Sequence, residues 1–482
     1  MTPAPRLIRN QKPPRTRIVH FGPGAFFRAF VGTYTDDASR ADVEDWGIAA
    51  VSLKSASARD ALMPQGGVYT SISLAPEGIE DRLVSCVTHV LVAPEDPETV
   101  LMQLAVPNTK IVTLTITEKG YCLNMRTCAL DTSAEDVQHD VANPSAPRTA
   151  IGYIVEGLAR RHSAGRRPFT VLSCDNLPDN GAATRRAVID LAHLRDPVLA
   201  AWIETEVRFP STMVDRIAPA TTKQSVSALA KRAGYFDPAC VQHEPFRQWV
   251  IEDDFVDDQR PDWDVAGAQF VRSVARHEAM KLRCLNGTHS ALAYLGYLAG
   301  YETIADCAAD PDFVALCRKL WAEEIVPTLD PPDDTDIGAY TEALLKRYSN
   351  PAIRHQTWQI AMDGSQKLPQ RLVATLLDQR ARCAVAPGLC LAIAAWMRYI
   401  GGLDEQGQEI DVRDPLASEL RHAADNAADP ASKVTSLLGM RAVFSEELAR
   451  DTVAVAEITK AYCELTSYGA RACVADYVRS GS

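Results

Sequence analysis

Residues 18–30 read Ile-Val-His-Phe-Gly-Pro-Gly-Ala-Phe-Phe-Arg-Ala-Phe: an apolar run, a glycine turn and the start of a helical pattern. This order is typical of dinucleotide sites, where a helix N-terminus and its backbone amides hold the pyrophosphate. Gly22 and Gly24 fit the first two glycines of the fingerprint, while Phe27 stands in place of the third. An ordinary strand-to-helix turn is the alternative, but position on the first strand of an α/β chain favours nucleotide binding.

The rest of the first half repeats the strand pattern. Apolar runs at 46–53, 110–116 and 169–174 are separated by helix-length segments, which indicates a parallel α/β sheet. Segment 60–90 alternates more strictly and is expected to be an antiparallel insertion.

Beyond about residue 272, helical periods dominate the sequence. They cover 276–300, 309–326, 335–348, 370–382, 385–400, 415–426, 431–439, 443–449 and 452–479. The sequence therefore predicts a Rossmann-type parallel-sheet domain over residues 1–272, with insertions, and a mostly helical domain over residues 273–482.

Composition excludes several classes of protein. The chain has 482 residues, which favours two domains, and its net charge of −12 argues against a nucleic-acid binder. No apolar run reaches the length of a membrane span, and the N-terminus lacks the apolar core of a signal peptide, so a cytoplasmic protein is expected. The 12 cysteines form no Cys-x-x-Cys pair, which favours reduced thiols and gives no zinc pattern.

A second informative stretch, Met-Lys-Leu-Arg-Cys-Leu-Asn-Gly-Thr-His at 280–289, begins a long apolar helical pattern. On an α-helix, Lys281, Asn286 and His289 fall within one arc of roughly 140°. Three polar groups on an apolar helix need partners, and a substrate is one candidate. The alternative for the lysine is a side chain that reaches out to solvent.

Cofactor preference is set near the end of the second strand, where an acid would hold the ribose 2′-hydroxyl of NAD. No acid follows Leu53 directly, whereas Lys54 and Arg59 are compatible with a 2′-phosphate. NAD is the expected cofactor, and NADP stays open.

Several stretches together resemble the mannitol dehydrogenase family, the long-chain polyol-specific dehydrogenases. In chain order they are Gly22-Pro23-Gly24-Ala25-Phe26 with Arg28-Ala29, Thr117-Glu118-Lys119-Gly120-Tyr121, Ser173-Cys174-Asp175-Asn176, Met213-Val214-Asp215-Arg216-Ile217, Glu244-Pro245-Phe246-Arg247-Gln248-Trp249-Val250, and Met280-Lys281-Leu282-Arg283 with Asn286 and His289. Phe27 and Phe30 depart from the histidines that relatives commonly carry there, which puts details of cofactor contact in doubt.

The second half resembles the fructuronate reductase, or D-mannonate oxidoreductase, branch of this family. The resemblance rests on Asn350-Pro351-Ala352-Ile353-Arg354-His355 and on residues 359–371, which include Lys367 and Arg371. It implies a reaction between D-mannonate and D-fructuronate. A polyol dehydrogenase acting on mannitol or arabinitol is the alternative, and a non-catalytic nucleotide-binding protein is the remote one.

The resemblance also implies roles for individual residues in a metal-independent hydride transfer. Lys281 acts as the acid/base, Asn176 and Asn286 hold the reacting oxygen, and His289 orients the substrate. Gly22, Pro23, Gly24, Ala25, Phe26, Arg28 and Glu118 contact the cofactor. Asp215 accepts from substrate hydroxyls, with an ion pair to Arg216 as the alternative.

A sugar acid needs a cation for its carboxylate. Arg354, His355, Lys367 and Arg371 are the candidates, because Asp363-Gly364-Ser365-Gln366 suits a binding loop. Alternatively, Lys367 and Arg371 belong to the solvated face of the next helix. The expected ligand is thus a small sugar acid or polyol, with no nucleic acid or membrane partner and the oligomeric state open.

Overall fold

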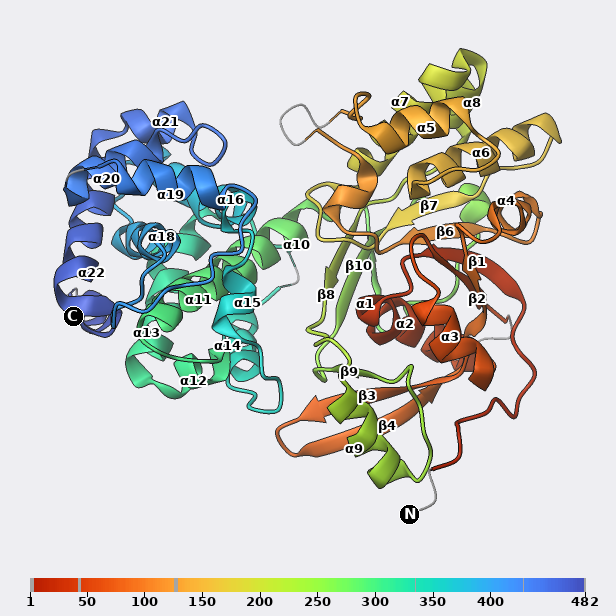
Figure 1. The fold of residues 1–482 in the computed structure, drawn as a ribbon, viewed down its shortest axis with the longest axis horizontal. Coiled ribbons are helices and arrows are strands. Elements are labelled where there is room, and N and C mark those ends of the chain that lie inside the picture. The colour runs from red at the N-terminus through yellow and green to blue at the C-terminus, as the bar shows by residue number, and fades with distance from the viewer. Residues whose placement is uncertain (1–3, 42–44, 125–128, 334, 428, 481–482) are drawn as a thin grey trace. The chain divides into compact units, whose positions relative to one another are not determined.

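The computed structural model describes residues 4–41, 45–124, 129–333, 335–427 and 429–480. The chain divides into two compact units, one ending at Ala275 and the other beginning at Arg276 (Figure 1). The sequence placed this boundary after residue 272.

The first unit combines strands and helices. Its strands are β1 (Thr16–Phe21), β2 (Gly47–Ser52), β3 (Tyr69–Ala75), β4 (Gly78–Val84), β5 (Val87–Val92), β6 (Ile111–Leu114), β7 (Thr170–Ser173), β8 (Thr212–Asp215), β9 (Val241–His243), β10 (Gln248–Glu252) and β11 (Gln269–Val271). Its helices are α1 (Ala25–Ala29), α2 (Val31–Ala41), α3 (Ser57–Leu62), α4 (Pro97–Ala105), α5 (Glu135–Ala142), α6 (Ala150–Ser163), α7 (Asn180–Arg195), α8 (Pro197–Glu206) and α9 (Lys223–Ala233), with 3₁₀ turns η1 (Met63–Gln65), η2 (Glu118–Tyr121) and η3 (Val256–Asp258).

The main sheet has the order β5-β2-β1-β6-β7, and every neighbouring pair in it is parallel. The chain starts at the central strand, winds outward on one side and then on the other, which is Rossmann topology and confirms the predicted fold class. The order changes direction between β1 and β6, so the carboxyl ends of these strands border the expected ligand crevice.

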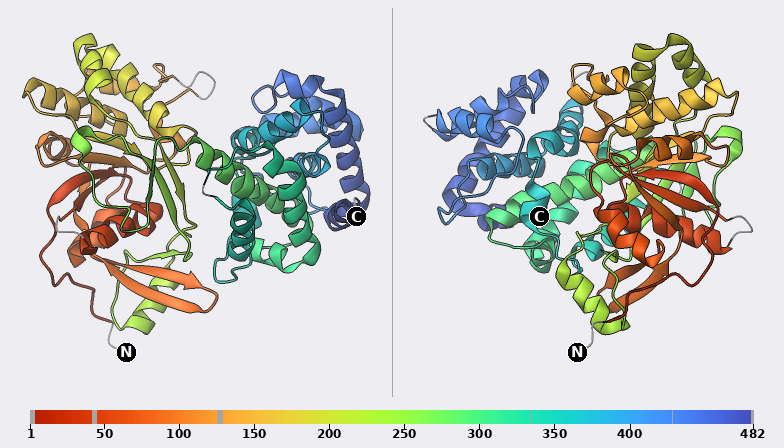
Figure 2. Two further views of the ribbon diagram at one scale, coloured as in Figure 1. Left: turned by 180° about the vertical axis from the view of Figure 1, so that it is seen from behind. Right: turned by 45° about the vertical axis from the view of Figure 1, so that its right-hand side comes forward.

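Helices cover both faces of this sheet (Figure 2). Val19 and Phe21 of β1 pack with α4, α6 and α7, whereas Ile18 faces the opposite side with α1 and α2. The alternation follows from the two-residue period of a strand, and burial on both faces explains the uninterrupted apolar runs.

Two smaller sheets complete the first unit, with orders β4-β3-β9 and β11-β10-β8. The antiparallel β3–β4 hairpin confirms part of the insertion expected over 60–90. The prediction was wrong at the end of that segment, because residues from Val87 onward form β5, which pairs in parallel with β2. Edge strands of parallel sheets also alternate, which explains the misassignment.

The second unit is helical. It contains α10 (Ala275–Met280), η4 (Lys281–Gly287), α11 (Thr288–Leu298), α12 (Ile304–Ala309), α13 (Pro311–Lys319), η5 (Leu320–Ile325), η6 (Val326–Thr328), α14 (Ile337–Tyr348), α15 (Thr357–Ala361), α16 (Gly364–Leu368), η7 (Pro369–Val373), α17 (Ala374–Ala381), α18 (Pro387–Ile400), α19 (Ala417–Asp425), α20 (Pro430–Leu438), α21 (Glu446–Arg450) and α22 (Thr452–Arg479). The short helices α12, α15 and α16 were not predicted, since five or six residues are too few for a periodic pattern. Segments η4, η5 and η7 are π-helical.

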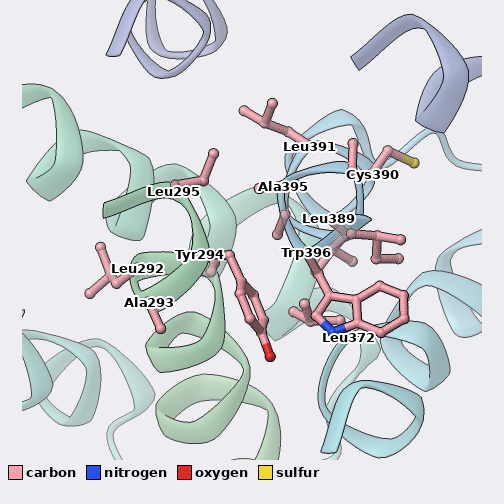
Figure 3. Packing of buried hydrophobic residues seen from close by; sticks show 14 of the residues in the cluster. Leu292, Ala293, Tyr294, Leu295, Leu372, Leu389, Cys390, Leu391, Ala395 and Trp396 are labelled. Carbon is pink, nitrogen blue, oxygen red and sulfur yellow. The ribbon is translucent and has the colours of Figure 1, made fainter. Parts of the chain in front are cut away.

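The core of the second unit forms around α11 and α18, which are apolar on nearly all sides. Tyr294 and Trp396 extend from these two helices (Figure 3). Gly364 lies against both rings: a Cβ there would stand 2.3 Å from Trp396 Nε1 and 2.6 Å from the Tyr294 hydroxyl. The expected loop at 363–366 is therefore wrong, because Gly364 begins helix α16 and is packed into the core.

Two predicted features concern the chain as a whole. The eleven cysteines that the structure describes form no disulfide, and Cys128 lies outside the described residues. Within the described ranges, no helix combines the length and apolarity that crossing a bilayer requires.

Candidate functional site

The glycine turn after β1 is bound to the end of β6. Gly22 has a φ of +93°, and a Cβ there would lie 2.1 Å from the Thr115 carbonyl oxygen, so this position requires glycine. A Cβ on Gly24 would meet only the Gly22 carbonyl oxygen, at 3.9 Å. Gly24 is exposed at the start of α1 and leaves its backbone accessible to a pyrophosphate.

His20 supports the turn from below. Its Nδ1 lies 2.8 Å from Thr113 Oγ1, and its Nε2 lies 2.9 Å from Thr115 Oγ1 and 3.2 Å from the Gly22 carbonyl oxygen. The Phe27 ring stacks on the imidazole with a centroid distance of 3.9 Å. Burial lowers the pKa of His20 to about 3, so the imidazole is neutral.

This arrangement explains why the fingerprint lacks its third glycine. That glycine normally lets the helix approach the strand closely. Here Phe27 fills the corresponding space and covers His20.

The predicted cofactor residue Arg28 also stabilises the turn. Its Nη1 donates to the Pro23 carbonyl oxygen at 2.8 Å, and its own carbonyl accepts from the Tyr69 hydroxyl at 2.7 Å. Pro23 is buried, whereas Ala25 and Phe26 are half-buried. The structure thus brings the predicted residues 22–28 together in one turn, with the Arg28 side chain directed back to it.

The ends of β6 and β7 are joined through Asp175, which was not among the predicted site residues. Its carboxylate accepts from the amides of Ile116 and Thr117, at 2.9 and 3.1 Å, and from the Tyr121 hydroxyl at 2.7 Å. Burial raises the pKa of Asp175 against the opposing effect of these hydrogen bonds.

Asp175 thereby fixes both loops that carry predicted site residues. Asn176 is exposed directly after it, and Glu118 is exposed at the start of η2. The available signal was the Ser-Cys-Asp-Asn motif itself, in which an acid precedes the asparagine at a strand end.

Asp215 is buried at the end of β8, with its backbone opposite Gln248 of β10. The neighbouring Arg216 donates to the carbonyls of Ala29 and Glu244, at 2.6 and 3.2 Å. The Arg216 guanidinium is thus committed to backbone carbonyls in the core of the first unit.

The two cations considered near the second strand differ in their surroundings. Lys54 is exposed just beyond β2, whereas Arg59 pairs with Asp60 at 3.0 Å and with Glu95. Lys54 is the cation better placed to meet a 2′-phosphate.

In the second unit, Lys281 is the first residue of the π-helical segment η4, where it is buried. The carbonyls of this segment take partners from other helices: Trp321 Nε1 donates to Cys284 and the Tyr348 hydroxyl donates to Leu285, each at 2.9 Å. Such bonds satisfy backbone oxygens that an α-helical ladder would otherwise use.

The helical-wheel spacing predicted for this stretch is therefore wrong in detail. Residues 281–287 do not advance by 100° each, and only from Thr288 onward does the α-helix continue. Lys281 and His289 are buried and Asn286 is half-buried. All three therefore lie away from bulk solvent, as the apolar pattern of this stretch indicated.

His289 stands at the centre of a group of cationic side chains. Its ring stacks on Tyr348, with centroids 5.3 Å apart, and contacts His355 edge to face at 4.8 Å. Burial lowers the pKa of His289, and the neighbouring side chains of His355, Arg371, Arg347 and Lys367 lower it further by disfavouring a positive charge on the ring. Burial first, and Lys367 second, lower the pKa of His355 to about 4.

Three of the four predicted carboxylate ligands, His355, Lys367 and Arg371, belong to this cationic group, and Arg354 lies apart. Arg371 Nη1 donates to Ser290 Oγ at 3.2 Å, and Lys367 Nζ donates to the Met362 carbonyl oxygen at 2.5 Å. Both side chains are partly buried, unlike the solvated helix face that was the alternative. Arg354 is 68% exposed and pairs with Glu302 at 3.0 Å.

A close backbone contact holds this group against the Lys281 segment. A Cβ on Gly287 would lie 2.8 Å from the Arg371 carbonyl oxygen, so glycine permits η4 and η7 to approach. Arg347 was missed by the sequence interpretation because it lies on α14, outside the segment considered.

Two ring nitrogens in the cationic group are buried without a hydrogen-bond partner among the described residues. They are His289 Nε2 and His355 Nδ1. Buried polar atoms of this kind cost free energy unless something satisfies them. Arg283, by contrast, pairs with Asp378 at 2.6 Å and donates to Thr328.

No group of three or more His, Cys, Asp or Glu side chains with the proximity needed to hold a metal ion occurs within the described ranges.

Comparison with known proteins identifies the family of both units. The Mannitol dehydrogenase Rossmann domain model matches residues 16–265, and the Mannitol dehydrogenase C-terminal domain model matches residues 273–466. The chain is 47% identical to D-mannonate oxidoreductase of Escherichia coli (strain K12) over 466 residues, or 95% of each chain. It is 38% identical to mannitol 2-dehydrogenase of Phaeosphaeria nodorum (strain SN15), over 95% of this chain and 81% of the relative.

A solved structure of a mannitol dehydrogenase is also similar to this chain over nearly its whole length. Pseudomonas fluorescens mannitol 2-dehydrogenase, in a ternary complex with NAD and D-mannitol, superposes with a TM-score of 0.88 and 36% identity, covering 97% of this chain and 95% of the other. The parallel sheet and the open Gly24 turn fit the NAD with which that protein was solved. The chain belongs to the mannitol dehydrogenase family of oxidoreductases.

Proposed function

We propose that this protein interconverts D-mannonate and D-fructuronate by NAD-dependent hydride transfer. The observation that carries the choice of a sugar acid is the cationic group around His289, because a carboxylate needs such surroundings. The 47% identity to a D-mannonate oxidoreductase supports the same choice.

The first unit supplies the cofactor site. NAD held there would supply a hydride acceptor for the alcohol carbon, and NADH would supply a hydride donor for the ketone. Gly22 and Gly24 bring the backbone to the pyrophosphate, and His20 and Thr115 keep the turn in place. Glu118 carries over as a residue bordering the cofactor.

Lys281 is proposed to be the acid/base. As a neutral amine it takes the hydroxyl proton during oxidation, and as an ammonium it returns a proton to the ketone oxygen. Lys281 is buried at the start of η4, which keeps this proton transfer away from bulk water. Asn176 and Asn286 are proposed to donate to the reacting oxygen and so stabilise the developing alkoxide without adding charge.

The cationic group is proposed to bind the substrate carboxylate. Lys367 and Arg371 supply positive charge, while neutral His289 and His355 supply ring nitrogens that have no hydrogen-bond partner among the described residues. Asp215 is proposed to accept from substrate hydroxyls. Arg354, engaged by Glu302 and largely exposed, is the weakest of the four carboxylate candidates.

The first test compares substrates. Purified protein is assayed for oxidation or formation of NADH, and separately NADPH, with fructuronate, tagaturonate, fructose and xylulose. Turnover of fructuronate with NADH at the highest kcat/KM is expected. Strong turnover of uncharged ketoses alone would overturn the sugar-acid assignment.

A second test uses Lys367→Ala, with Arg354→Ala as its matched control in the neighbouring segment. Removing a cation that binds the carboxylate is expected to raise the KM for fructuronate about tenfold or more, since charged hydrogen bonds contribute about 1.5–3 kcal/mol. The control variant should keep its KM within about twofold, because an exposed ion pair contributes little. An unchanged KM in Lys367→Ala would remove this residue from the site.

A polyol dehydrogenase is the second candidate. It is supported by the 0.88 TM-score to a mannitol 2-dehydrogenase solved with D-mannitol. Under this proposal the same residues would act on a neutral ketose, and Lys367→Ala would affect fructose turnover as strongly as fructuronate turnover.

A further inference from the structure

Two adjoining cavities lie at the amino ends of the main sheet, at the edge opposite the glycine turn. Their volumes are about 390 and about 250 Å³, and Lys110 and Gln259 line both. Arg17 belongs to the start of β1, and Trp46 and Lys110 directly precede β2 and β6. These parallel strands place their first residues side by side, so the cavities belong to the sheet edge and are remote from the proposed cofactor turn.

Basic side chains dominate the lining of both cavities. The larger is lined by Arg15, Arg17, Lys110 and Arg260 with Asp258 as its acid, and the smaller by Lys110, Arg161, Arg166 and Arg167 with Asp257. This excess stands out in a chain whose net charge is −12. Local concentration of one sign of charge in a concave surface attracts the opposite ion.

Two of these arginines are already neutralised. Arg260 pairs with Asp253 at 3.0 Å, and Arg167 pairs with Glu206 and Asp257 at 3.0 and 2.7 Å. Their charges are balanced by these carboxylates, so they add little to the positive potential of the cavities. The attraction for an anion must therefore come from Arg15, Lys110, Arg161 and Arg166.

Among these cations, Arg161 is buried and forms no ion pair with a carboxylate of the described residues. It is 2% exposed and donates to the carbonyls of Leu104, Val106, Thr109 and Arg167. Arg166 is adjacent in sequence and lines the same cavity.

Lys110 is held at the junction of the two cavities by its backbone. Its amide donates to the Arg17 carbonyl oxygen at 2.8 Å, and its carbonyl accepts from the Thr170 amide at 2.9 Å. The Arg17 guanidinium lies over the Trp46 ring at 5.1 Å. The backbone of Lys110 and Arg17 is thus fixed by β1, β6 and β7. Binding an anion would therefore require little ordering of the main chain.

We propose that this edge of the sheet is a second anion site that takes a small ligand bearing phosphoryl groups. Lys110 contributes a point charge shared by both cavities, and Arg15 and Arg166 supply planar donors around it. Cavities of this size accommodate a phosphoryl ester or a diphosphate and are too small for a nucleic acid. The site is independent of the proposed dehydrogenase reaction.

Isothermal titration of the full-length protein with inorganic pyrophosphate tests the proposal. It compares wild type with Lys110→Gln and Arg15→Gln, and with Lys231→Gln as the control, an exposed lysine on α9 of the same unit. Arg15 is also exposed, so its variant is expected to fold normally and keeps the test valid if Lys110→Gln is unstable. Saturating NAD is included in a parallel series to occupy the glycine turn.

Each site variant is expected to weaken pyrophosphate binding about fivefold to tenfold, since each removes one charged contact. Lys231→Gln should bind like wild type, and wild-type affinity should fall as ionic strength rises. Wild-type binding that survives in both site variants, or that NAD abolishes, would assign pyrophosphate to the glycine turn and overturn the proposal. Equal affinity for citrate would overturn the assignment to phosphoryl groups.

Discussion

The glycine turn of the first unit and the π-helical segment of the second hold polar groups in place by different means. The turn is fixed by a regular parallel sheet, and its irregularity is confined to one residue, Gly22. Lys281 depends on an irregular helix whose carbonyls are satisfied by the side chains of Trp321 and Tyr348. Regular structure leaves a readable motif, whereas the π segment depends on partners distant in sequence.

The largest expected effect concerns Lys281. Lys281→Ala should lower kcat about 10²–10⁴-fold, because it removes general acid/base assistance. Binding of NADH, measured by fluorescence titration, should stay within about twofold of wild type. Lys346→Ala, an exposed lysine on α14, is the control. A Lys281→Ala variant with full turnover would refute the acid/base role.

The next effect contrasts the two glycines of the turn. Gly22→Ala should lower the free energy of unfolding by about 2–4 kcal/mol, because the positive φ and the clash with the Thr115 carbonyl act together. Gly24→Ala should change it by less than about 0.5 kcal/mol. Urea unfolding followed by circular dichroism measures both.

Gly24→Ala should nevertheless weaken NAD binding, since its Cβ would project where the pyrophosphate approaches. Equal destabilisation by the two substitutions would mean that the turn is not held against β6 as described.

A smaller effect depends on pH. Because the pKa of His20 is lowered to about 3, the unfolded chain takes up a proton near pH 6.5 that the folded chain does not. The contribution of neutral His20 to the free energy of unfolding is therefore fully present above pH 6.5 and is lost as the pH falls towards 3.

Between pH 7.5 and 5 this linkage corresponds to about 2 kcal/mol. His20→Gln should be less stable at pH 7.5 but should lose about 2 kcal/mol less than wild type over that range. Urea unfolding at both pH values measures the difference. Parallel losses in the two proteins would show that His20 does not contribute to acid sensitivity.

The smallest expected effect concerns the hydrogen bond from Tyr348 to the π-helical segment η4. Tyr348→Phe leaves the Leu285 carbonyl without its donor but keeps the ring against His289, so a loss of about 1 kcal/mol is expected. The KM for fructuronate should rise with little change in NADH affinity. Tyr297→Phe on α11 is the control, since no hydrogen bond of its hydroxyl is found among the described residues. Identical thermal unfolding of Tyr348→Phe and wild type would contradict the support.

The sequence predicted the parts of the fold that depend on local pattern. The strand, glycine turn and helix at residues 16–29 were readable because burial on both faces and a positive-φ glycine leave local signatures. The pattern at 280–289 singled out Lys281 and Asn286, the resemblance added Asn176, and the roles of all three stay predictions.

The remainder depends on long-range contacts. The π segments, Asp175 as the link between β6 and β7, and Arg347 in the cationic group each require partners far away in the chain. Phe27 looked like a defect in the fingerprint until its stacking on His20 gave it a packing role. A single sequence without such contacts gives residue types but not the geometry that relates them.

The π segment also changes how the chain responds to a change in its length. A π turn holds about one residue more than an α-helical turn, so η4 behaves as an inserted residue absorbed inside a continuous helix. Removing one residue from 281–287 would let this segment return to α-helical geometry and would leave the residues after it, including His289 beside Tyr348, nearly in place. Removing one residue from the regular helix α11 would instead rotate every residue after the deletion by about 100° and turn its apolar face away from α18. The π segment therefore tolerates the loss of a residue better than the α-helix that follows it.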